Sequence, residues 1–265
     1  MKFIICDESC TNCRFFVLGA LVLPVHNHSI LTEELSAWKT AHRLNAASEF
    51  KWTKVSRGYL PLYAEMMRWL FSHLRAGHLQ VRVLVMDTRD SHYKTFCERQ
   101  TSKGFYKAYY HLLLQSTKQV LYDDPNDRVL VLLDEKRERY PFHKEVLKKA
   151  LNSALRRDRG ASGRVSNVED RQSSGPHGEV LIQPVDVLIG AVGFARNGFA
   201  ARPGASPAKQ ELVRLIEQEA GSTLAYDTSP RSSFNVWTFD LGIAMARKAT
   251  WKDREQRAKR KRPQA

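Results

Sequence analysis

The sequence predicts a single α/β domain with a mixed sheet that opens with a β-hairpin. Two apolar, β-branched stretches flank a short polar turn at the start of the chain, which is the pattern of a hairpin. After it, apolar runs typical of buried strands alternate with stretches of helical periodicity. The chain has 265 residues, 43% of them hydrophobic and 10% aromatic, and this is enough to bury a sizeable core.

The hairpin and the helix after it are predicted from local patterns. FIIC predicts a strand over 2–7, SCTN predicts a turn, and the apolar run that follows predicts a returning strand over 14–23. The next apolar residues recur at roughly helical spacing and predict a helix over 29–43: Ile30, Leu31, Leu35, Trp38 and Ala41.

The remaining elements alternate between the two periodicities. YLPLYAEMMRWLFSHLRA is an amphipathic helix that Gly77 can cap, and LQVRVLVMD is a buried strand. RVLVLLDE is a second buried strand, and EVLIQPVDVLIGAVGFARNG is an apolar helix that tolerates Pro184 near its first turn. The expected elements are helix 59–76, strand 79–87, helix 104–123, strand 128–135, helix 141–158, a short strand and loop within 164–175, helix 179–198, a loop over 199–207, and helices 208–220 and 234–247.

The charge balance favours a polyanionic partner. Lys and Arg outnumber Asp and Glu by 42 to 28, which gives a net charge of +14. Nine of these basic residues and two of the acids lie in 247–265, so the rest of the chain is basic as well. Nucleic acid is the first partner that such a distribution indicates. We expect one domain over 1–246, with a helical C-terminal addition over 199–246, and a basic, disordered tail over 247–265.

The apolar start of the chain does not predict a membrane segment. The run FFVLGALVLPV has 11 residues and contains Pro24, so it is too short to span a bilayer. A signal peptide would not place Asp7 and Glu8 directly after a four-residue apolar stretch. We therefore expect a cytoplasmic protein without a membrane partner, whose four cysteines stay reduced.

Three cysteines in the motif CDESCTNC raise the question of a metal–thiolate site. Cys6, Cys10 and Cys13 have the spacing C-x3-C-x2-C, which can hold an iron–sulfur cluster in a loop that wraps it. Cys6, however, lies inside a predicted strand and faces away from Asp7. A tetrahedral zinc site would need a fourth ligand, and Cys97 is isolated in the sequence. We interpret Cys6 as a core residue and the other two as turn thiols, with an iron–sulfur enzyme as the less favoured alternative.

Three acids lie where α/β proteins gather their sites. Asp7 ends the first predicted strand and Asp134 ends the strand VLVLL, so both are expected at one edge of the sheet. Asp186 lies in an apolar helix and therefore faces the core or a site. A buried carboxylate needs a partner, and a divalent cation is a good one. For a single buried acid, an Arg side chain or backbone N–H groups would be equally good partners.

A fourth acid, Glu49, belongs to the segment SEFKW. In a strand, Glu49 and Lys51 would share a face and point together at a phosphate or a metal. The pattern E-x-K is also the core of restriction-type nucleases, which require an Asp on a strand shortly before it. The nearest earlier acids, Glu33 and Glu34, lie in a predicted helix. A restriction-type nuclease is therefore a second hypothesis, and it requires Glu49 to lie on a strand.

Four acids together could bind two Mg²⁺ or Mn²⁺ ions, which prefer hard oxygen ligands. In chain order they are Asp7, Glu49, Asp134 and Asp186. Two ions about 4 Å apart promote in-line attack on a phosphodiester, because one activates water and the other stabilises the leaving oxygen. A basic surface would bring in the polyanionic substrate.

These segments together resemble a known bacterial family. DES before an apolar returning strand, SEFKW, VLLDE and LIQPVDVLIGAV have the order and spacing of the Domain of Unknown Function 3800 family, over residues 3–196. The resemblance implies an RNase H-like fold and a metal-dependent nuclease. It implies that Asp7, Glu49, Asp134 and Asp186 are the acidic catalytic and metal-binding set, and that Lys51, Ser173 and Gln183 accompany them. We expect Lys51 to be catalytic as well, and Lys51, Lys54, Ser173 and Gln183 to bind nucleic acid. Cys10 replaces a glycine that is usual in the family, and QPVD replaces Q-x-A-D.

The sequence therefore supports four functional hypotheses. The favoured one is an RNase H-like, Mg²⁺- or Mn²⁺-dependent nuclease with two ions. The others are the restriction-type nuclease, a non-catalytic nucleic-acid-binding or toxin/defence-associated module with the same fold, and the iron–sulfur enzyme. Loss of Asp134 discriminates the first from the third, because binding through a basic surface survives that loss whereas cleavage does not.

Overall fold

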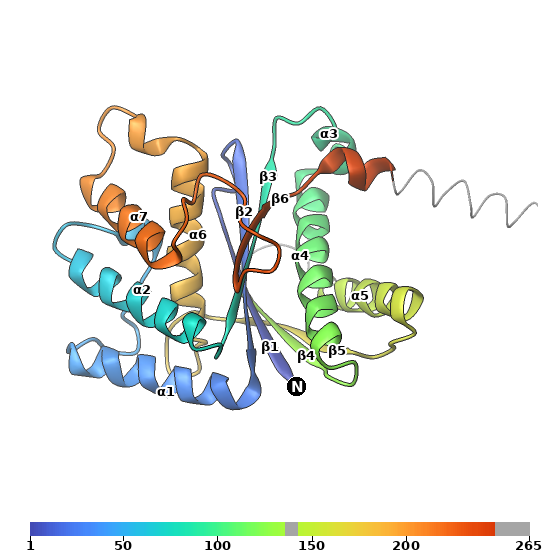
Figure 1. The fold of residues 1–265 in the computed structure, drawn as a ribbon, viewed down its shortest axis with the longest axis horizontal. Coiled ribbons are helices and arrows are strands. Elements are labelled where there is room, and N and C mark those ends of the chain that lie inside the picture. The colour runs from blue at the N-terminus through green and yellow to red at the C-terminus, as the bar shows by residue number, and fades with distance from the viewer. Residues whose placement is uncertain (136–142, 247–265) are drawn as a thin grey trace, which may run out of the picture.

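The computed structural model describes residues 1–135 and 143–246, and its centre is a six-stranded mixed sheet with helices on both faces (Figure 1). The basic tail predicted over 247–265 lies outside the described residues. In chain order the elements are β1 (Lys2–Ser9), β2 (Phe15–Pro24), α1 (Val25–Ala41), the 3₁₀ turn η1 (Trp52–Lys54), α2 (Leu60–Arg75), β3 (Gln80–Asp87), α3 (Tyr93–Phe96), α4 (Thr101–Asp123), β4 (Val129–Asp134), α5 (His143–Arg159), β5 (Val165–Arg171), α6 (Ile182–Arg196), η2 (Phe199–Ala201), α7 (Pro207–Ala220) and β6 (Phe234–Thr238).

The strands lie in the order β5-β4-β1-β2-β3-β6. The predicted hairpin is confirmed, because β1 pairs with β2 antiparallel, and β2 pairs with β3 in the same way. The remaining pairs, β1–β4, β4–β5 and β3–β6, are parallel. At the hairpin turn Cys10 adopts a positive φ of 56° and its carbonyl accepts a hydrogen bond from the Cys13 N–H at 2.9 Å. Cys10 thus takes the left-handed conformation that glycine adopts most easily.

The register of the two central parallel strands places two of the predicted acids side by side. Cys6 of β1 is opposite Leu133 of β4, so Asp7 and Asp134 follow at neighbouring positions at the carboxyl ends of their strands. Successive side chains on a strand point to opposite faces. The two acids therefore share one face of the sheet, and Cys6 and Leu133 share the other.

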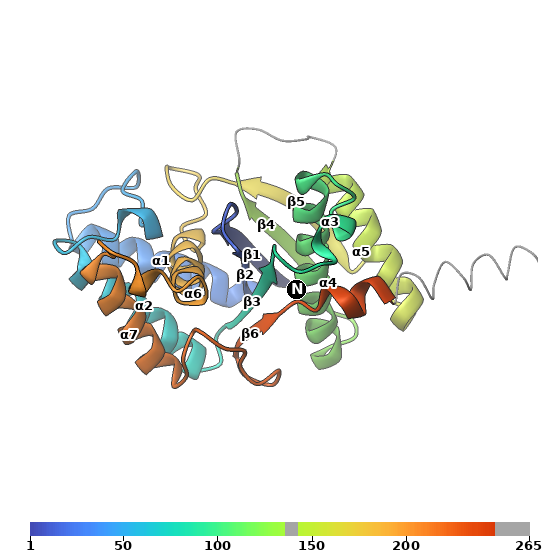
Figure 2. The ribbon, with the colours of Figure 1, turned by 90° about the horizontal axis from the view of Figure 1, so that it is seen from above.

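Two hydrophobic cores cover the two faces of the sheet (Figure 2). Helices α1, α2, α6 and α7 pack on the face that carries Asp7, and α4 and α5 pack on the opposite face. Cys6 is fully buried on the α4 side, where it packs with residues such as Leu112. This placement agrees with its interpretation as a core residue.

Helix α6 lies directly on β1 and β2 because a glycine allows it to approach. Gly19 is opposite Asp7 in the hairpin register. A Cβ at Gly19 would lie 2.3 Å from Cγ2 of Ile189, so a larger residue there would push the helix away from the sheet. Pro184 lies in the first turn of α6, as predicted. The close approach brings Asp186 of α6 to the strand end that carries Asp7.

One local prediction is wrong, and the condition for one hypothesis is not met. The helix expected over 234–247 begins with strand β6, whose Phe234 pairs with Val81, and residues 241–246 are helical. The C-terminal addition over 199–246 is therefore not purely helical, since part of it extends the sheet. Glu49 does not lie on a strand: residues 48–51 have no regular structure and lead into η1. The restriction-type hypothesis required that strand and is not supported. Within the described ranges, no helix has both the length and the apolar composition needed to cross a membrane.

Candidate functional site

Three acids from three separate elements meet at one edge of the sheet. Asp7 is only 3% exposed, and its Oδ1 accepts a hydrogen bond from the N–H of Glu8 at 2.7 Å. The Asp7 and Asp186 carboxyls lie within hydrogen-bonding reach of each other. Asp134 is the neighbour of Asp7 on β4 and interacts electrostatically with Asp186. The predicted convergence of strand-end and helix carboxylates is therefore present in the structure.

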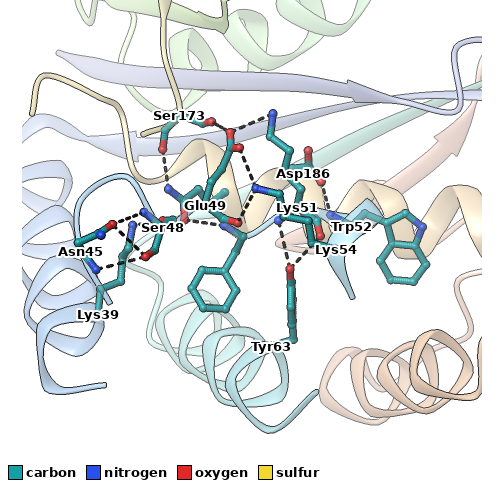
Figure 3. Close-up of polar contacts among 12 residues, drawn as sticks. Lys39, Asn45, Ser48, Glu49, Lys51, Trp52, Lys54, Tyr63, Ser173 and Asp186 are labelled. Carbon is teal, nitrogen blue, oxygen red and sulfur yellow. Dashed lines mark hydrogen bonds and ion pairs between the residues drawn. The ribbon is translucent and has the colours of Figure 1, made fainter. Parts of the chain in front are cut away.

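Residues 48–55, here called the strap, bring the fourth acid and two lysines to these carboxylates (Figure 3). Lys51 Nζ lies 2.9 Å from Glu49 Oε1, and Lys54 Nζ lies 3.4 Å from Glu49 Oε2. The hydroxyl of Ser173, from the loop after β5, also donates to Glu49 Oε1. Lys51 is the central cation of the site, because it also interacts with Asp134 and Asp186.

The strap is fastened to α6 by two backbone hydrogen bonds. The N–H of Phe50 donates to Gln183 Oε1 at 3.1 Å, and the N–H of Trp52 donates to Asp186 Oδ1 at 2.7 Å. Gln183 also donates from Nε2 to the carbonyl of Ser173 at 2.6 Å. Because Gln183 and Asp186 are three residues apart on one helix, both side chains face the strap.

Tyr63 of α2 fastens the other side of the strap. Its hydroxyl donates to the carbonyl of Lys51 at 2.9 Å and accepts from the Lys51 N–H at 3.3 Å. Burial raises the pKa of Tyr63 to about 12, so the hydroxyl keeps its proton at neutral pH and remains a donor. The backbone of the strap is thus held from both sides, and the Lys51 side chain is directed at the acids.

Crowding of the acids disfavours their ionised forms. Burial, and then the nearby carboxylates of Asp186 and Glu49, raise the pKa of Asp134 to about 6, against the opposing effect of Lys51. Burial also raises the pKa of Asp186, although the Trp52 N–H and the Lys51 ammonium oppose it. An additional cation among these carboxylates would relieve the repulsion between them.

For the two charged strap residues Glu49 and Lys51, the surroundings favour the ionised forms. Burial opposes ionisation of Glu49, but the Ser173 hydrogen bond and the ammonium groups of Lys51 and Lys54 outweigh it and lower its pKa. Burial likewise disfavours the Lys51 ammonium, but Glu49, and then Asp134 and Asp186, raise its pKa. Glu49 and Lys51 are therefore a charged pair at neutral pH.

The donor set of the site fits Mg²⁺ or Mn²⁺ chemically. All four acids offer carboxylate oxygens, which are the hard ligands that these ions prefer. Among the described residues, no three His, Cys, Asp or Glu side chains are arranged so that they would already hold a metal ion. Glu49 is turned toward Lys51, Lys54 and Ser173, and these contacts account for its position.

All eight residues selected from the sequence lie in this one region: Asp7, Glu49, Lys51, Lys54, Asp134, Ser173, Gln183 and Asp186. Cys10 and Cys13 lie together at the hairpin turn, but Cys6 is apart from them. Cys6 lies in the core on the α4 face, whereas Cys10 lies against α6 at Gly193 on the other face. Glu8 points away from Asp7 and accepts a hydrogen bond from Tyr109 of α4.

Sequence reasoning did not identify three residues that shape the site: Lys39, Trp52 and Tyr63. Lys39 carried a signal, because it continues the helical spacing of Leu31 and Leu35 and thus falls on the buried face of α1. Trp52 and Tyr63 act through backbone atoms of the strap, and a contact of that kind leaves no pattern in the sequence.

Replacing Gln183 by Leu is expected to destabilise the fold by about 2–4 kcal/mol, because it leaves the Phe50 N–H and the Ser173 carbonyl without their buried partner. Urea denaturation measures the free energy of unfolding. The matched control is Gln115→Leu on the exposed face of α4, which should change stability by less than about 0.5 kcal/mol. Equal effects of the two substitutions would contradict the role given to Gln183.

Comparison with known protein families finds no family model that matches the chain, and comparison with curated proteins finds no significant match.

Proposed function

We propose that this protein is a metal-dependent nuclease that hydrolyses phosphodiester bonds in nucleic acid. The observation that carries the proposal is the convergence of four acids from four segments far apart in the sequence. Asp134, Asp186 and Glu49 surround Lys51, and Asp7 adjoins Asp186. Three or four carboxylates at one point of a fold are costly, and such groupings occur where they bind a cation.

The sheet supports an RNase H-like fold as part of the proposal. Its first three strands form an antiparallel meander, and β4 and β5 then add parallel to β1 on the other side. The acids lie at the carboxyl ends of β1 and β4, next to a helix that packs on the hairpin. The resemblance to the Domain of Unknown Function 3800 family also implies an RNase H-like fold.

In this proposal Asp7, Asp134, Asp186 and Glu49 hold Mg²⁺ or Mn²⁺, with two ions bound. A metal bound by these residues would supply an activated water and neutralise charge on the phosphodiester. Burial and the neighbouring carboxylates raise the pKa of Asp134 to about 6, and a bound cation would favour its ionised form. Lys51 and Lys54 offer positive charge beside the acids, and Lys54 is exposed enough, at 56% of its side chain, to meet a phosphate from solvent.

Cleavage of labelled single-stranded DNA, duplex DNA, RNA and RNA–DNA hybrid tests the proposal, with Mn²⁺, Mg²⁺ or EDTA. We expect metal-dependent cleavage that Asp186→Asn reduces at least about 100-fold, because a metal ligand is lost while the acceptor for the Trp52 N–H is kept. Asp158→Asn, which removes an exposed ion pair with Lys118 on the opposite face, should cleave like the wild type.

Absence of cleavage on all four substrates would overturn the proposed reaction. If salt-sensitive binding then survived in Asp186→Asn, the result would support the non-catalytic nucleic-acid-binding module instead. Cleavage that EDTA does not affect would overturn the metal requirement.

A further inference from the structure

A pocket lined by both polar and apolar residues lies beside the strap. It has a volume of about 280 Å³ and lies between the second half of α1 and the loop that precedes α6. Ser173 and Gln183 of the candidate site belong to its wall, so the pocket and the site are contiguous. Hydroxyl, amide and ammonium groups line it: Thr32, Ser36, Lys39, Thr40, Asn45 and Ser174.

Lys39 gives the pocket a buried positive charge. The side chain lies on the buried face of α1, is only 5% exposed, and donates from Nζ to the carbonyl of Ser48 at 2.5 Å (Figure 3). An ammonium group has three hydrogen atoms to donate. Among the described residues, no carboxylate lies within ion-pair distance of Lys39. Burial lowers the pKa of Lys39, although the more distant Glu49 carboxylate partly opposes this effect. A buried charge of this kind favours an anionic ligand.

A second, independent feature of the wall also indicates a ligand. The hydroxyl oxygen of Thr32 is buried, yet it has no hydrogen-bond partner within the described part of the chain. Buried polar groups in native proteins almost always have one. A ligand with hydroxyl, amide or phosphate oxygen atoms would supply that partner.

We propose that this pocket binds one phosphate-bearing nucleotide of the substrate strand, with its phosphate on Lys39. This inference rests on the proposed nuclease function and adds a subsite to it. The volume is at the low end of small-molecule sites, which suits one nucleotide and excludes a base pair. The Lys39 partner Ser48 directly precedes Glu49, so a nucleotide held there lies next to the carboxylates.

The subsite is tested by calorimetric titration of the full chain with adenosine monophosphate, adenosine and inorganic phosphate, all in EDTA. EDTA removes any contribution from a bound metal. We expect adenosine monophosphate to bind at least about tenfold more tightly than adenosine, because a charge-assisted hydrogen bond is lost with the phosphate. It should also bind more tightly than inorganic phosphate, because the pocket wall contacts the nucleoside.

Lys39→Met should weaken the binding of adenosine monophosphate about tenfold or more, since it removes the charge and keeps the length of the side chain. The control Lys94→Met, an exposed lysine of α3, should bind like the wild type. If Lys39→Met does not fold, Thr32→Val replaces it and should weaken binding about two- to tenfold.

The outcomes separate this inference from the proposed function. No binding of adenosine monophosphate by the wild type, or unchanged binding by Lys39→Met and Thr32→Val, overturns the subsite even if the protein cleaves nucleic acid. Equal affinity for adenosine monophosphate and inorganic phosphate overturns the nucleotide and leaves a phosphate site. Binding that depends on Lys39 in a protein that does not cleave supports the subsite and overturns the nuclease.

Discussion

Replacing Asp134 by Asn is expected to stabilise the fold above pH 6 and to abolish metal-dependent cleavage. The carboxyl has a pKa of about 6 in the folded protein, against 3.8 for an ordinary Asp, because it is buried beside Asp186 and Glu49. The folded state therefore binds the proton more tightly than the unfolded state does. Between pH 3.8 and 6, stability falls as pH rises, and above pH 6 the full penalty is present.

An amide at position 134 removes this penalty. After a discount for partial solvent screening, the free energy of unfolding of Asp134→Asn should exceed that of the wild type by about 1–2 kcal/mol above pH 6. This difference should disappear below pH 4. For a chain of this size the melting temperature should rise by about 2–4 °C per kcal/mol. Cleavage should fall at least about 100-fold in the same variant, because a proposed metal ligand is lost. A thermal melt at each pH from 4 to 8, with cleavage measured alongside, checks both effects.

Metal binding gives the same experiment a second readout. Mn²⁺ should raise the melting temperature of the wild type more at pH 7.5 than at pH 5, because the proton on Asp134 competes with the ion. The variant should lose most of this increase. The control Asp158→Asn, whose carboxylate is exposed and pairs with Lys118, should reproduce the wild-type profile. A melting temperature of Asp134→Asn that parallels the wild type at every pH would contradict the proposed crowding of acids.

Much of the sheet could be predicted because its strands carry their own signals. The apolar runs of β1, β2, β3 and β4 are recognisable without knowledge of their partners. The strand Phe234–Thr238 is different, since it is five residues long and is followed directly by a helical stretch. Its strand conformation depends on parallel pairing with β3, a contact with residues about 150 positions earlier. Local periodicity cannot report such pairing.

Some residues of the candidate site were likewise predictable from local sequence, and others depend on contacts between distant segments. Asp7 and Asp134 were predictable because a strand end has a position in an α/β fold before the fold is known. The position of Glu49 depends on the irregular strap, so its pairing with Lys51 was expected for the wrong reason, namely a shared face of a strand. The fastening by Gln183 and Tyr63 involves backbone atoms of the strap, which any sequence would offer.

Replacing Gly190 by Ala is expected to displace the strap and to reduce cleavage about 10- to 100-fold, because positioning errors near 1 Å carry costs of that size. Gly190 lies one turn after Asp186 on α6, directly beneath Trp52. A Cβ at Gly190 would lie 2.2 Å from Cγ of Trp52, and that ring also packs edge-on against Phe194. The ring must therefore move, and the Trp52 N–H would leave Asp186.

Gly190→Ala should be less stable than the wild type, although alanine is a better helix former than glycine. Alanine in a helix gains up to about 1 kcal/mol over glycine, whereas overpacking costs about 1–3 kcal/mol and more where the neighbour is rigid. We expect a net loss of about 1–2 kcal/mol in urea denaturation. Gly58→Ala is the matched control, because a Cβ there would contact nothing within 4 Å. It should be neutral in stability and in cleavage.

A double-mutant cycle shows whether the clash with Trp52 is the cause. In the background Trp52→Ala the ring is absent, so Gly190→Ala should no longer destabilise the fold and should show only the gain from helix propensity. Additive losses in the double variant would mean that Gly190 acts elsewhere. A coupling of about 1–3 kcal/mol would instead show that the contact between helix and ring sets the position of the strap, and with it the distance between Glu49 and the acids of the sheet.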